Sequence, residues 1–262
     1  STMKLPTITL PSTSGGFAGL VAQPQSFELP WPGRAKPLDV AFLEVEPERL
    51  LDLALSDGRI DPYSASVWPS AYAAATTLLR CLGERNGAVL ELGCGVGLPA
   101  LAATAAGAVD VTVSDHSPLS LELVLHAAAA FQPGRKIHTC EVDLRDRQQQ
   151  LPPHDYLVAA DLMYDDDVAF ALGRHVRAQR ERGATAILAD PGRKGGRFRA
   201  AFARGLGEDV HFVEQRLPKR WRADVPSCGV SVLRPAGGRE RRLPSREVLA
   251  RAKAYRRERA SA

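Results

Sequence analysis

A chain of 262 residues is long enough for one large α/β domain with short appendages and too short for two full-sized enzyme domains. With 45% hydrophobic and 24% charged residues, and no apolar run near the roughly 20 residues of a membrane-spanning helix, the composition excludes a wholly disordered chain and predicts no membrane span. The net charge is +4, but residues 239–259 hold nine basic residues and three glutamates, so the positive excess belongs to the tail and says little about the rest.

The first 60 residues alternate short apolar runs with Pro and Gly, which predicts an N-terminal extension of strands and extended cover. Residues 1–27 contain no Asp or Glu and are rich in Ser, Thr, Gly and Pro, as organellar transit segments often are, but Lys4 is their single basic residue. The four cysteines are scattered without C-x-x-C spacing, which favours a reducing intracellular compartment and no structural metal. We expect an intracellular protein, with the cytoplasm and an organelle (mitochondrion or plastid) both left open.

From residue 61 onward, strand-like runs alternate with helical segments. The helical segments that apolar periodicity predicts are residues 70–82, 98–106, 119–130, 168–182 and 198–206. The strand-like runs are residues 88–92, 109–114, 136–142, 156–160 and 184–189. Strands separated by helices of this length indicate βαβ units, and hence a parallel sheet with helices on both faces.

The pattern changes after residue 206. Two strand-like runs, residues 211–217 and 229–234, follow each other without a convincing helix, which predicts an antiparallel pair. The predicted fold class is therefore α/β, a doubly wound, mostly parallel seven-stranded sheet with a terminal antiparallel hairpin. We assign residues 61–235 to this domain and residues 236–262 to a basic C-terminal tail, in which residues 245–259 predict a helix.

A glycine loop directly follows the first predicted core strand, in the segment Val89-Leu-Glu-Leu-Gly-Cys-Gly-Val-Gly-Leu98. Gly93, Gly95 and Gly97 let the backbone pass close to a ligand and reach conformations that larger residues avoid. Their G-x-G-x-G spacing differs from the G-x-G-x-x-G of dinucleotide-binding loops, and the sequence has no P-loop motif. Glu91 would repel a pyrophosphate and attract an ammonium or sulfonium group. A tight strand-to-helix turn without a ligand is the alternative.

Two aspartates end the next two predicted strands. Asp115 comes about 20 residues after the glycine loop, where an acidic side chain commonly accepts the ribose hydroxyls of a nucleoside; capping of the following helix is the alternative. Asp143 ends the third strand and is a candidate acceptor for an adenine amino group. Because Asp146 is close by, a simple loop role for Asp143 stays open. These positions predict a nucleoside site beside the glycine loop.

From about residue 61 to residue 234 the chain resembles the class I, seven-β-strand S-adenosylmethionine-dependent methyltransferases, which have a Rossmann-like fold. Within that class it is similar to the protein-lysine methyltransferases that include the electron-transfer-flavoprotein β-subunit lysine methyltransferase. Three segments carry the narrower resemblance: Asp61-Pro-Tyr-Ser-Ala-Ser-Val-Trp-Pro69, the D-x-x-Y segment Asp161-Leu-Met-Tyr-Asp-Asp-Asp167, and Ala189-Asp-Pro-Gly-Arg193.

The resemblance implies S-adenosyl-L-methionine as cofactor and S-adenosyl-L-homocysteine as product. It also implies that Trp68 and Ala160 bind the cofactor, that Asp161 lies at its methionine end, and that Tyr164 borders the channel for the target amine. Asp161 and Tyr164 are therefore the candidate catalytic residues. The expected activity is transfer of a methyl group to a protein side chain, the ε-amine of lysine.

Two other hypotheses stay open. Methylation of RNA or of a small-molecule amine would suit phosphate contacts through the basic tail and a second set of basic residues, although a solvated helix face also explains such charges. That set is Arg193, Lys194, Arg197 and Arg199. The D-x-x-Y segment is not the N-P-P-[YF] of many enzymes that methylate nucleic-acid amino groups or glutamine amides, which disfavours those substrates but leaves them open. A non-catalytic binding module on the same fold is the third hypothesis, and the intact glycine loop argues against it.

Overall fold

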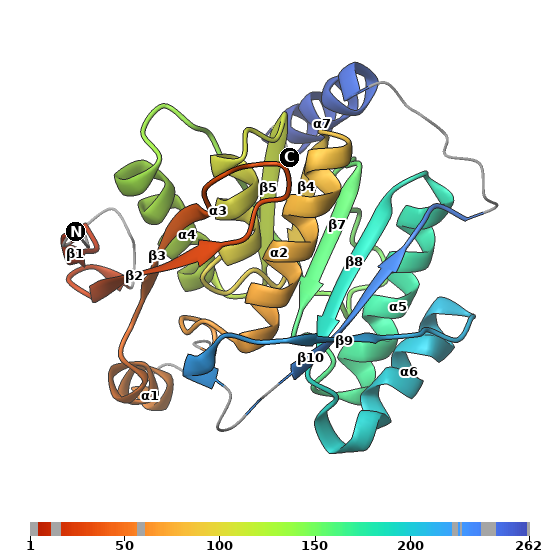
Figure 1. Ribbon diagram of the computed structural model, residues 1–262. Coiled ribbons are helices and arrows are strands. Elements are labelled where there is room, and N and C mark those ends of the chain that lie inside the picture. Colours follow the sequence, from red (N-terminus) through yellow and green to blue (C-terminus); the bar gives the residue numbers. More distant parts are fainter. Residues whose placement is uncertain are drawn as a thin grey trace.

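Figure 1 shows the computed structural model, which describes residues 5–11, 17–56, 61–221, 225, 227–236 and 245–260. Its main sheet has seven strands in the order β6-β5-β4-β7-β8-β10-β9. The strands are β4 (Ala88–Leu92), β5 (Asp110–Asp115), β6 (His138–Glu141), β7 (Tyr156–Ala160), β8 (Thr185–Asp190), β9 (Val213–Arg216) and β10 (Ser227–Leu233). Neighbouring strands are parallel from β6 through β5, β4 and β7 to β8, whereas β10 pairs antiparallel with both β8 and β9. The predicted doubly wound, mostly parallel sheet with a terminal antiparallel hairpin is confirmed.

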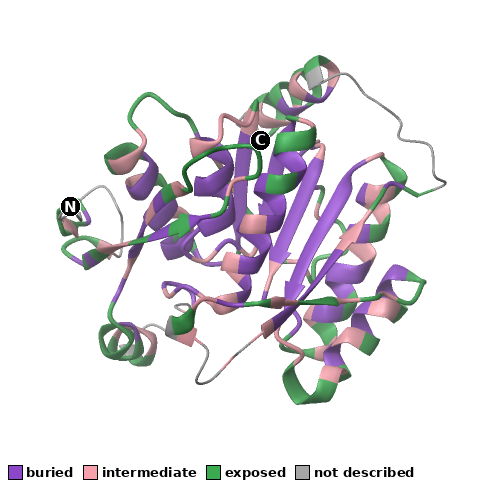
Figure 2. Cartoon of the chain, viewed as in Figure 1, coloured by how far each residue is buried: buried purple, intermediate pink, exposed green. Residues whose placement is uncertain are grey.

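Helices cover both faces of this sheet. They are α2 (Pro69–Glu84), α3 (Leu98–Ala105), α4 (Pro118–Phe131), α5 (Asp166–Glu181) and α6 (Arg197–Leu206). Successive residues of β4 serve opposite faces, since Val89 packs in the core with α2 to α4 while Leu90 packs in the core with α5 and α6. The central strands are therefore buried on both sides, as their colour in Figure 2 shows, and this explains why most of their residues are apolar, although β4 contains the buried Glu91.

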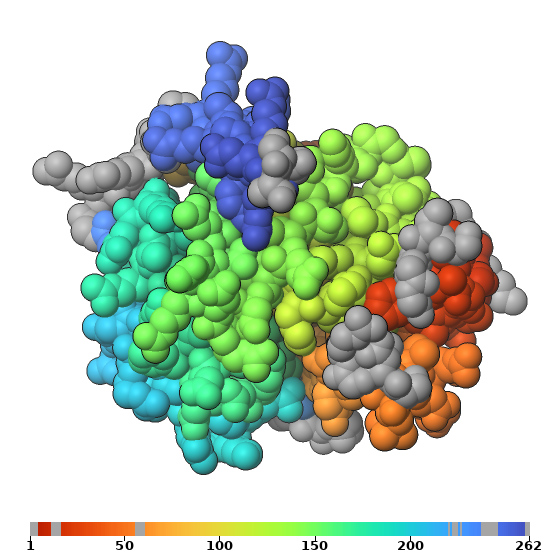
Figure 3. Space-filling model, turned by 180° about the vertical axis from the view of Figure 1, so that it is seen from behind, coloured from red at the N-terminus to blue at the C-terminus, as the bar shows by residue number. Residues whose placement is uncertain are grey.

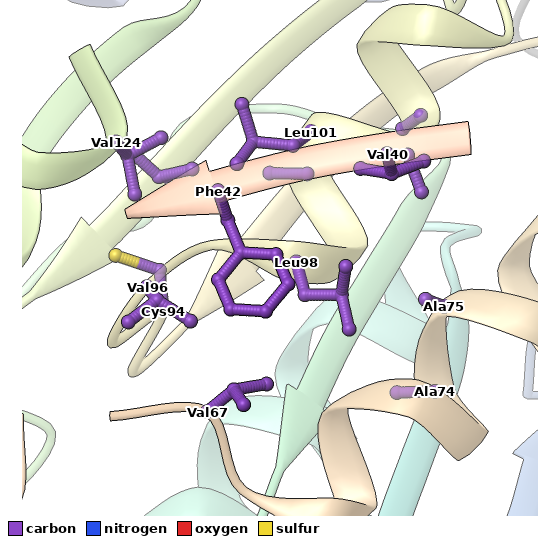
Figure 4. Close-up of a cluster of buried hydrophobic side chains, with 14 of the residues drawn as sticks. Val40, Phe42, Val67, Ala74, Ala75, Cys94, Val96, Leu98, Leu101 and Val124 are labelled. Atoms are coloured by element: carbon purple, nitrogen blue, oxygen red, sulfur yellow. The ribbon is translucent and has the colours of Figure 1, made fainter. Parts of the chain in front are cut away.

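The amino-terminal region forms a second sheet of three antiparallel strands, β1 (Ile8–Thr9), β2 (Val21–Leu29) and β3 (Leu38–Glu44). β3 contacts α3 and α4, and Figure 4 shows its residue Phe42 beside Leu98 of α3. The predicted strands are thus present and share one hydrophobic core with the main sheet. The expectation of only strands and extended cover was wrong for residues 47–56, which form α1 (Pro47–Ser56). This helix starts at a proline, a residue that is common at the first helical position.

The basic tail contains α7 (Ser245–Ala260), which confirms the helix predicted there. α7 lies against the amino ends of the parallel strands, where Arg256 pairs with Asp110 at 3.0 Å and the Tyr255 hydroxyl donates to the Gln150 carbonyl at 2.8 Å. Figure 3 shows the helix lying on the surface at this end of the molecule. Ala252 on its inner side is buried. Across the described ranges, no helix combines the length and apolarity needed to cross a bilayer.

Candidate active site

A cavity of about 380 Å³ opens at the carboxyl ends of the parallel strands, the edge where α/β sheets bind ligands. Its lining includes Gly95 from the loop after β4, Asp115 at the end of β5, Asp161 from the loop after β7 and Trp68 from the segment before α2. A second hollow of about 420 Å³ shares residues with the first, including Tyr164. The two hollows together form one elongated site that crosses the glycine loop.

The three glycines of the loop are favoured by their backbone conformation and, at Gly93 and Gly97, also by the lack of space for a side chain. Gly93, Gly95 and Gly97 have φ angles of 58°, 50° and 71°, in the left-handed region that favours glycine. A Cβ atom on Gly93 would lie 2.3 Å from Leu162, and one on Gly95 would lie 3.3 Å from the Ser64 carbonyl oxygen. Gly93 and Gly95 line the cavity, so their bare backbone forms a cradle that a side chain would fill.

Asp115 connects the glycine loop to the next strand. Its carboxylate accepts hydrogen bonds from the backbone amides of Gly95 and Ser117, both at 2.9 Å, and the side chain is 6% exposed. His116 approaches the same carboxylate with Nδ1 at 3.3 Å. A hydrogen bond to Asp115, with the added charges of Asp61 and Asp143, raises the pKa of His116 against the opposing effect of burial. The cavity therefore has a fixed anionic side at the end of β5.

Asp161 carries the other buried carboxylate of the cavity. Its φ of 58° is rare for a residue with a side chain, and such strain concentrates at functional sites. Arg193 donates from Nε and Nη2 to the two carboxylate oxygens of Asp161, each at 2.9 Å. The guanidinium carbon of Arg193 lies 5.1 Å from the centre of the Trp68 ring, a cation–π distance. Arg193 thus links Asp161, which follows β7, to Trp68 in the segment before α2.

Aromatic side chains form the remaining wall. Trp68 Nε1 donates to the Tyr63 carbonyl at 3.2 Å, and the two rings lie 6.1 Å apart. Tyr164, which also lines the cavity, is half-exposed, and partial burial raises the pKa of its hydroxyl. Aromatic faces beside Asp115 and Asp161 suit a cationic or partly cationic ligand. Among the described residues, no three His, Cys, Asp or Glu side chains group as metal ligands would.

A family model described as lysine methyltransferase matches residues 50–189, more than half of the chain. The chain belongs to the lysine methyltransferase family. It is 32% identical over 139 residues to the electron transfer flavoprotein beta subunit lysine methyltransferase of Xenopus laevis, covering 51% of this chain and 54% of that protein. The Rattus norvegicus protein of the same name is 32% identical over 138 residues, covering 51% and 52%. The chain spans about half the length of these curated relatives.

Solved structures of methyltransferases are also similar to this chain. A T. thermophilus 16S rRNA methyltransferase has a TM-score of 0.48 and 19% identity, covering 80% of this chain and 51% of that one. TrmN from Thermus thermophilus has a TM-score of 0.47 and 21% identity, covering 74% and 56%.

Most residues proposed for a methyltransferase site lie together in the cavity. The cavity lining includes Trp68, Gly93, Gly95, Asp115, Ala160, Asp161 and Tyr164. Gly97 lies behind the loop, where a Cβ atom would be 2.4 Å from Val124. Glu91 lies under the loop and lines neither hollow, because its carboxylate accepts from the backbone amide of Ala100 at 2.9 Å. Gly97 and Glu91 therefore support the loop from within.

Asp143 lies in the second hollow, away from Asp161. Its carboxylate pairs with Arg145 through Nε at 3.0 Å and Nη2 at 3.1 Å, and this hydrogen bonding lowers the pKa of Asp143. The side chain is half-exposed, so part of the carboxylate remains open to a ligand. Asp165 of the same hollow caps α5. Its carboxylate accepts hydrogen bonds from the backbone amides of Asp167 and Val168, as expected for an acidic residue at a helix start.

Sequence reasoning did not select six residues that line this cavity: Asp61, Tyr63, Ser64, His116, Leu162 and Arg193. Tyr63 belongs to the segment of residues 61–69 that carries the family resemblance, and His116 directly follows Asp115. Arg193 was considered as a phosphate contact and as the end of a segment that carries the family resemblance; it lines the cavity and pairs with Asp161. The Asp-Pro-Gly-Arg sequence at the end of β8 was the available signal for its position.

Proposed function

We propose that this protein is an S-adenosylmethionine-dependent N-methyltransferase that places a methyl group on a protein side chain, the ε-amine of lysine. The observation that carries the proposal is that the D-x-x-Y residues Asp161 and Tyr164 share one cavity with Gly95 and Asp115 of the nucleoside site. A cofactor-binding region and a region suited to an amine are therefore adjacent. That adjacency is what direct transfer between two bound reactants needs.

The cradle fits S-adenosylmethionine. The bare backbone of Gly93 and Gly95 admits a ligand where a Cβ atom would collide or fill the space. Asp115 would hold the ribose hydroxyls, and Asp143, reached through the second hollow, would accept from the adenine amino group. When bound, the cofactor supplies an electrophilic methyl group on a sulfonium, and S-adenosylhomocysteine is the product.

The residues of the cavity would prepare the amine. A lysine ammonium has a reference pKa of roughly 10.4, so it must lose a proton before it can attack. The rings of Tyr63, Trp68 and Tyr164 would exclude water and favour the neutral amine, since burial disfavours the charged form. Asp161, held by Arg193, would orient the amine toward the methyl group and accommodate the positive charge that develops on nitrogen.

A protein substrate is favoured by the family to which the chain belongs and by the names of its curated relatives. The alternative of an RNA substrate depended partly on the basic tail. α7 lies at the amino ends of the strands, while the cavity is at their carboxyl ends, so this helix does not line the cavity. The proposed acceptor is therefore a protein lysine. The proposed location of the protein is an intracellular compartment.

A labelling experiment tests this proposal. The purified protein would be incubated with radiolabelled S-adenosylmethionine and a cell extract, with and without ribonuclease, alongside two variants. Asp161→Ala removes the cavity carboxylate, and Asp209→Ala removes an exposed carboxylate elsewhere. We expect a ribonuclease-resistant protein band with the wild type and Asp209→Ala, absent with Asp161→Ala, and methyl-lysine on mass spectrometry of that band. Label found only in nucleic acid or small molecules would refute the protein substrate.

A further inference from the structure

Arg193 joins the two sides of the cavity. Its Nε and Nη2 atoms each lie 2.9 Å from a different oxygen of Asp161, and its guanidinium faces the Trp68 ring. Asp161 comes from the loop after β7, and Trp68 precedes α2. A bidentate pair fixes both the distance and the plane of a carboxylate, which a single hydrogen bond does not. One side chain therefore sets where the Asp161 carboxylate points.

A second set of hydrogen bonds holds the segment that carries Arg193. Asp190, the last residue of β8, is buried and accepts from the backbone amide of Gly192 at 2.9 Å. Arg199 of α6 donates to Asp190 through Nε at 2.6 Å and through Nη2 to its backbone carbonyl at 2.7 Å. Hydrogen bonds thus connect α6 to Asp190, and Asp190 to Gly192, the residue before Arg193. Arg193 in turn pairs with Asp161.

The backbone on both sides of this contact is strained. Asp161 has a φ of 58° and Lys194, next to Arg193, has a φ of 48°. Left-handed backbone at residues with side chains costs free energy and persists where the surroundings impose it. The side chain of Asp161 is 4% exposed, whereas that of Arg193 is 39% exposed at the cavity. Arg193 is thus placed between the buried carboxylate and the space where a ligand would lie.

We propose that Arg193 is a positioning residue for methyl transfer, which holds the Asp161 carboxylate by both oxygens in the orientation that receives the target amine. The inference rests on the proposed function, because the amine is the acceptor proposed above. Arg193 acts through Asp161 and Trp68 and does not bind the cofactor. A phosphate contact is a weaker explanation, since the two donors Nε and Nη2 are already committed to Asp161.

The test separates positioning from cofactor binding. Arg193→Ala removes the guanidinium, Arg193→Lys keeps the charge without the planar fork, and Arg197→Ala is the matched control, an exposed arginine of α6 that pairs with Asp166 on the surface. For each variant, kcat and KM would be measured with the protein identified in the labelling experiment. The Kd for S-adenosylmethionine would be measured by calorimetry, which needs no turnover.

We expect kcat to fall about 10- to 100-fold in both Arg193 variants, because misplacing a reacting group by about 1 Å costs rate on this scale. The Kd for S-adenosylmethionine should stay within about threefold of the wild type, because Arg193 contacts a carboxylate of the protein and not the glycine cradle. Added guanidinium chloride at low, non-denaturing concentration should restore part of the lost kcat in Arg193→Ala and none in Arg193→Lys, where the lysine occupies the space. Arg197→Ala should match the wild type.

Several outcomes would overturn the inference. They are an unchanged kcat in Arg193→Ala, a Kd for the cofactor weakened tenfold or more, and a loss of kcat that guanidinium does not restore. Each of these leaves the proposed function standing, because the wild type still methylates its substrate. A wild type that methylates no protein would instead refute the proposed function. The Arg193→Lys variant, which keeps the positive charge and a long side chain, guards against a result that reflects only misfolding.

Discussion

The carboxylate of Glu91 accepts a hydrogen bond from the backbone amide of Ala100 at 2.9 Å, in a position where Glu91 is only 2% exposed. Burial raises the pKa of Glu91 well above its ordinary value, and the Ala100 hydrogen bond opposes this effect. A group with a higher pKa in the folded state stabilises the fold fully below its unfolded pKa, and loses that contribution as the pH rises through its folded pKa. Glu91 should therefore make the protein less stable as the pH increases above the ordinary glutamate range.

Glu91→Gln should remove this pH dependence while leaving an oxygen to accept from Ala100. We expect the Tm of the variant, relative to the wild type, to increase between about pH 5 and pH 8, the interval above the ordinary pKa of glutamate. Thermal unfolding at several pH values measures the difference. Glu84→Gln, at an exposed position of α2, is the control and should show a constant difference. A Glu91→Gln difference that stays flat or falls with pH would contradict the burial argument.

Gly97 and Gly95 should respond differently to a methyl group. In Gly97→Ala, left-handed backbone costs about 1–2 kcal/mol, and the overlap with Val124 at 2.4 Å adds about 1–3 kcal/mol of overpacking. Gly95→Ala has the same backbone cost at its φ of 50°, but its Cβ atom meets only the Ser64 carbonyl oxygen at 3.3 Å and faces the cavity, so it should also weaken binding of S-adenosylmethionine. Urea unfolding and calorimetric titration measure the two effects.

Gly134→Ala supplies the matched control for this pair. Gly134 has a φ of 80°, but an added Cβ atom would meet no atom within 4 Å. It should therefore show the backbone cost without the overlap and without any change in cofactor affinity. If Gly97→Ala proved no less stable than Gly134→Ala, the packing of the loop against Val124 would not be a determinant of stability.

The hydroxyl of Tyr164 can be tested separately from its ring. Tyr164→Phe keeps the aromatic wall that excludes water, so we expect the Kd for S-adenosylmethionine to be unchanged and kcat to fall by about tenfold or less, the loss of one hydrogen bond to the amine. Tyr164→Ala removes the wall as well and should lower kcat further. Steady-state kinetics of both variants decide the matter. Equal activity of the alanine and phenylalanine variants would assign no role to the ring.

The sequence predicted the parallel strands well because they are buried on both faces. Ala88–Leu92 and Tyr156–Ala160 were delimited to the residue, since a mostly apolar run ends where the strand leaves the core. α1 was missed because the alternation of apolar runs with Pro and Gly was interpreted as strands and extended cover over all of the first 60 residues, although a proline also begins helices. Local sequence signals therefore predicted the strands that are buried on both faces. They failed at a proline, which can either interrupt a strand or begin a helix.

The candidate site was predicted less completely, because sequence order does not show which side chains face each other. Asp161 and Arg193 are 32 residues apart and meet only through the parallel pairing of β7 with β8. Glu91 was placed correctly at the end of a strand, but its direction toward α3 depends on how that helix packs. The glycine loop was predictable because its conformations themselves require glycine.

The contact between Arg256 and Asp110 fixes α7 to the end of the sheet opposite the cavity. Arg256 Nη1 donates to Asp110 at 3.0 Å, where the aspartate side chain is 11% exposed, and His138 Nε2 lies 3.5 Å from the same carboxylate. Arg256→Gln leaves the Asp110 carboxylate poorly paired, which should cost about 1–3 kcal/mol of unfolding free energy. Arg251→Gln, which breaks only the exposed pair with Glu247, should cost less than about 1 kcal/mol.

The same substitution should change the titration of His138. Burial lowers the pKa of His138, and the charge of Arg256 lowers it further. Because the folded chain then binds its proton less well than the unfolded chain, the wild type loses stability as the pH falls through the ordinary histidine range. Arg256→Gln should raise the pKa of His138 and reduce that loss, which NMR titration and unfolding at several pH values would measure. Binding of S-adenosylmethionine should not change, because the cavity lies at the other end of the strands; a weaker Kd in this variant would mean that α7 and the cavity are coupled.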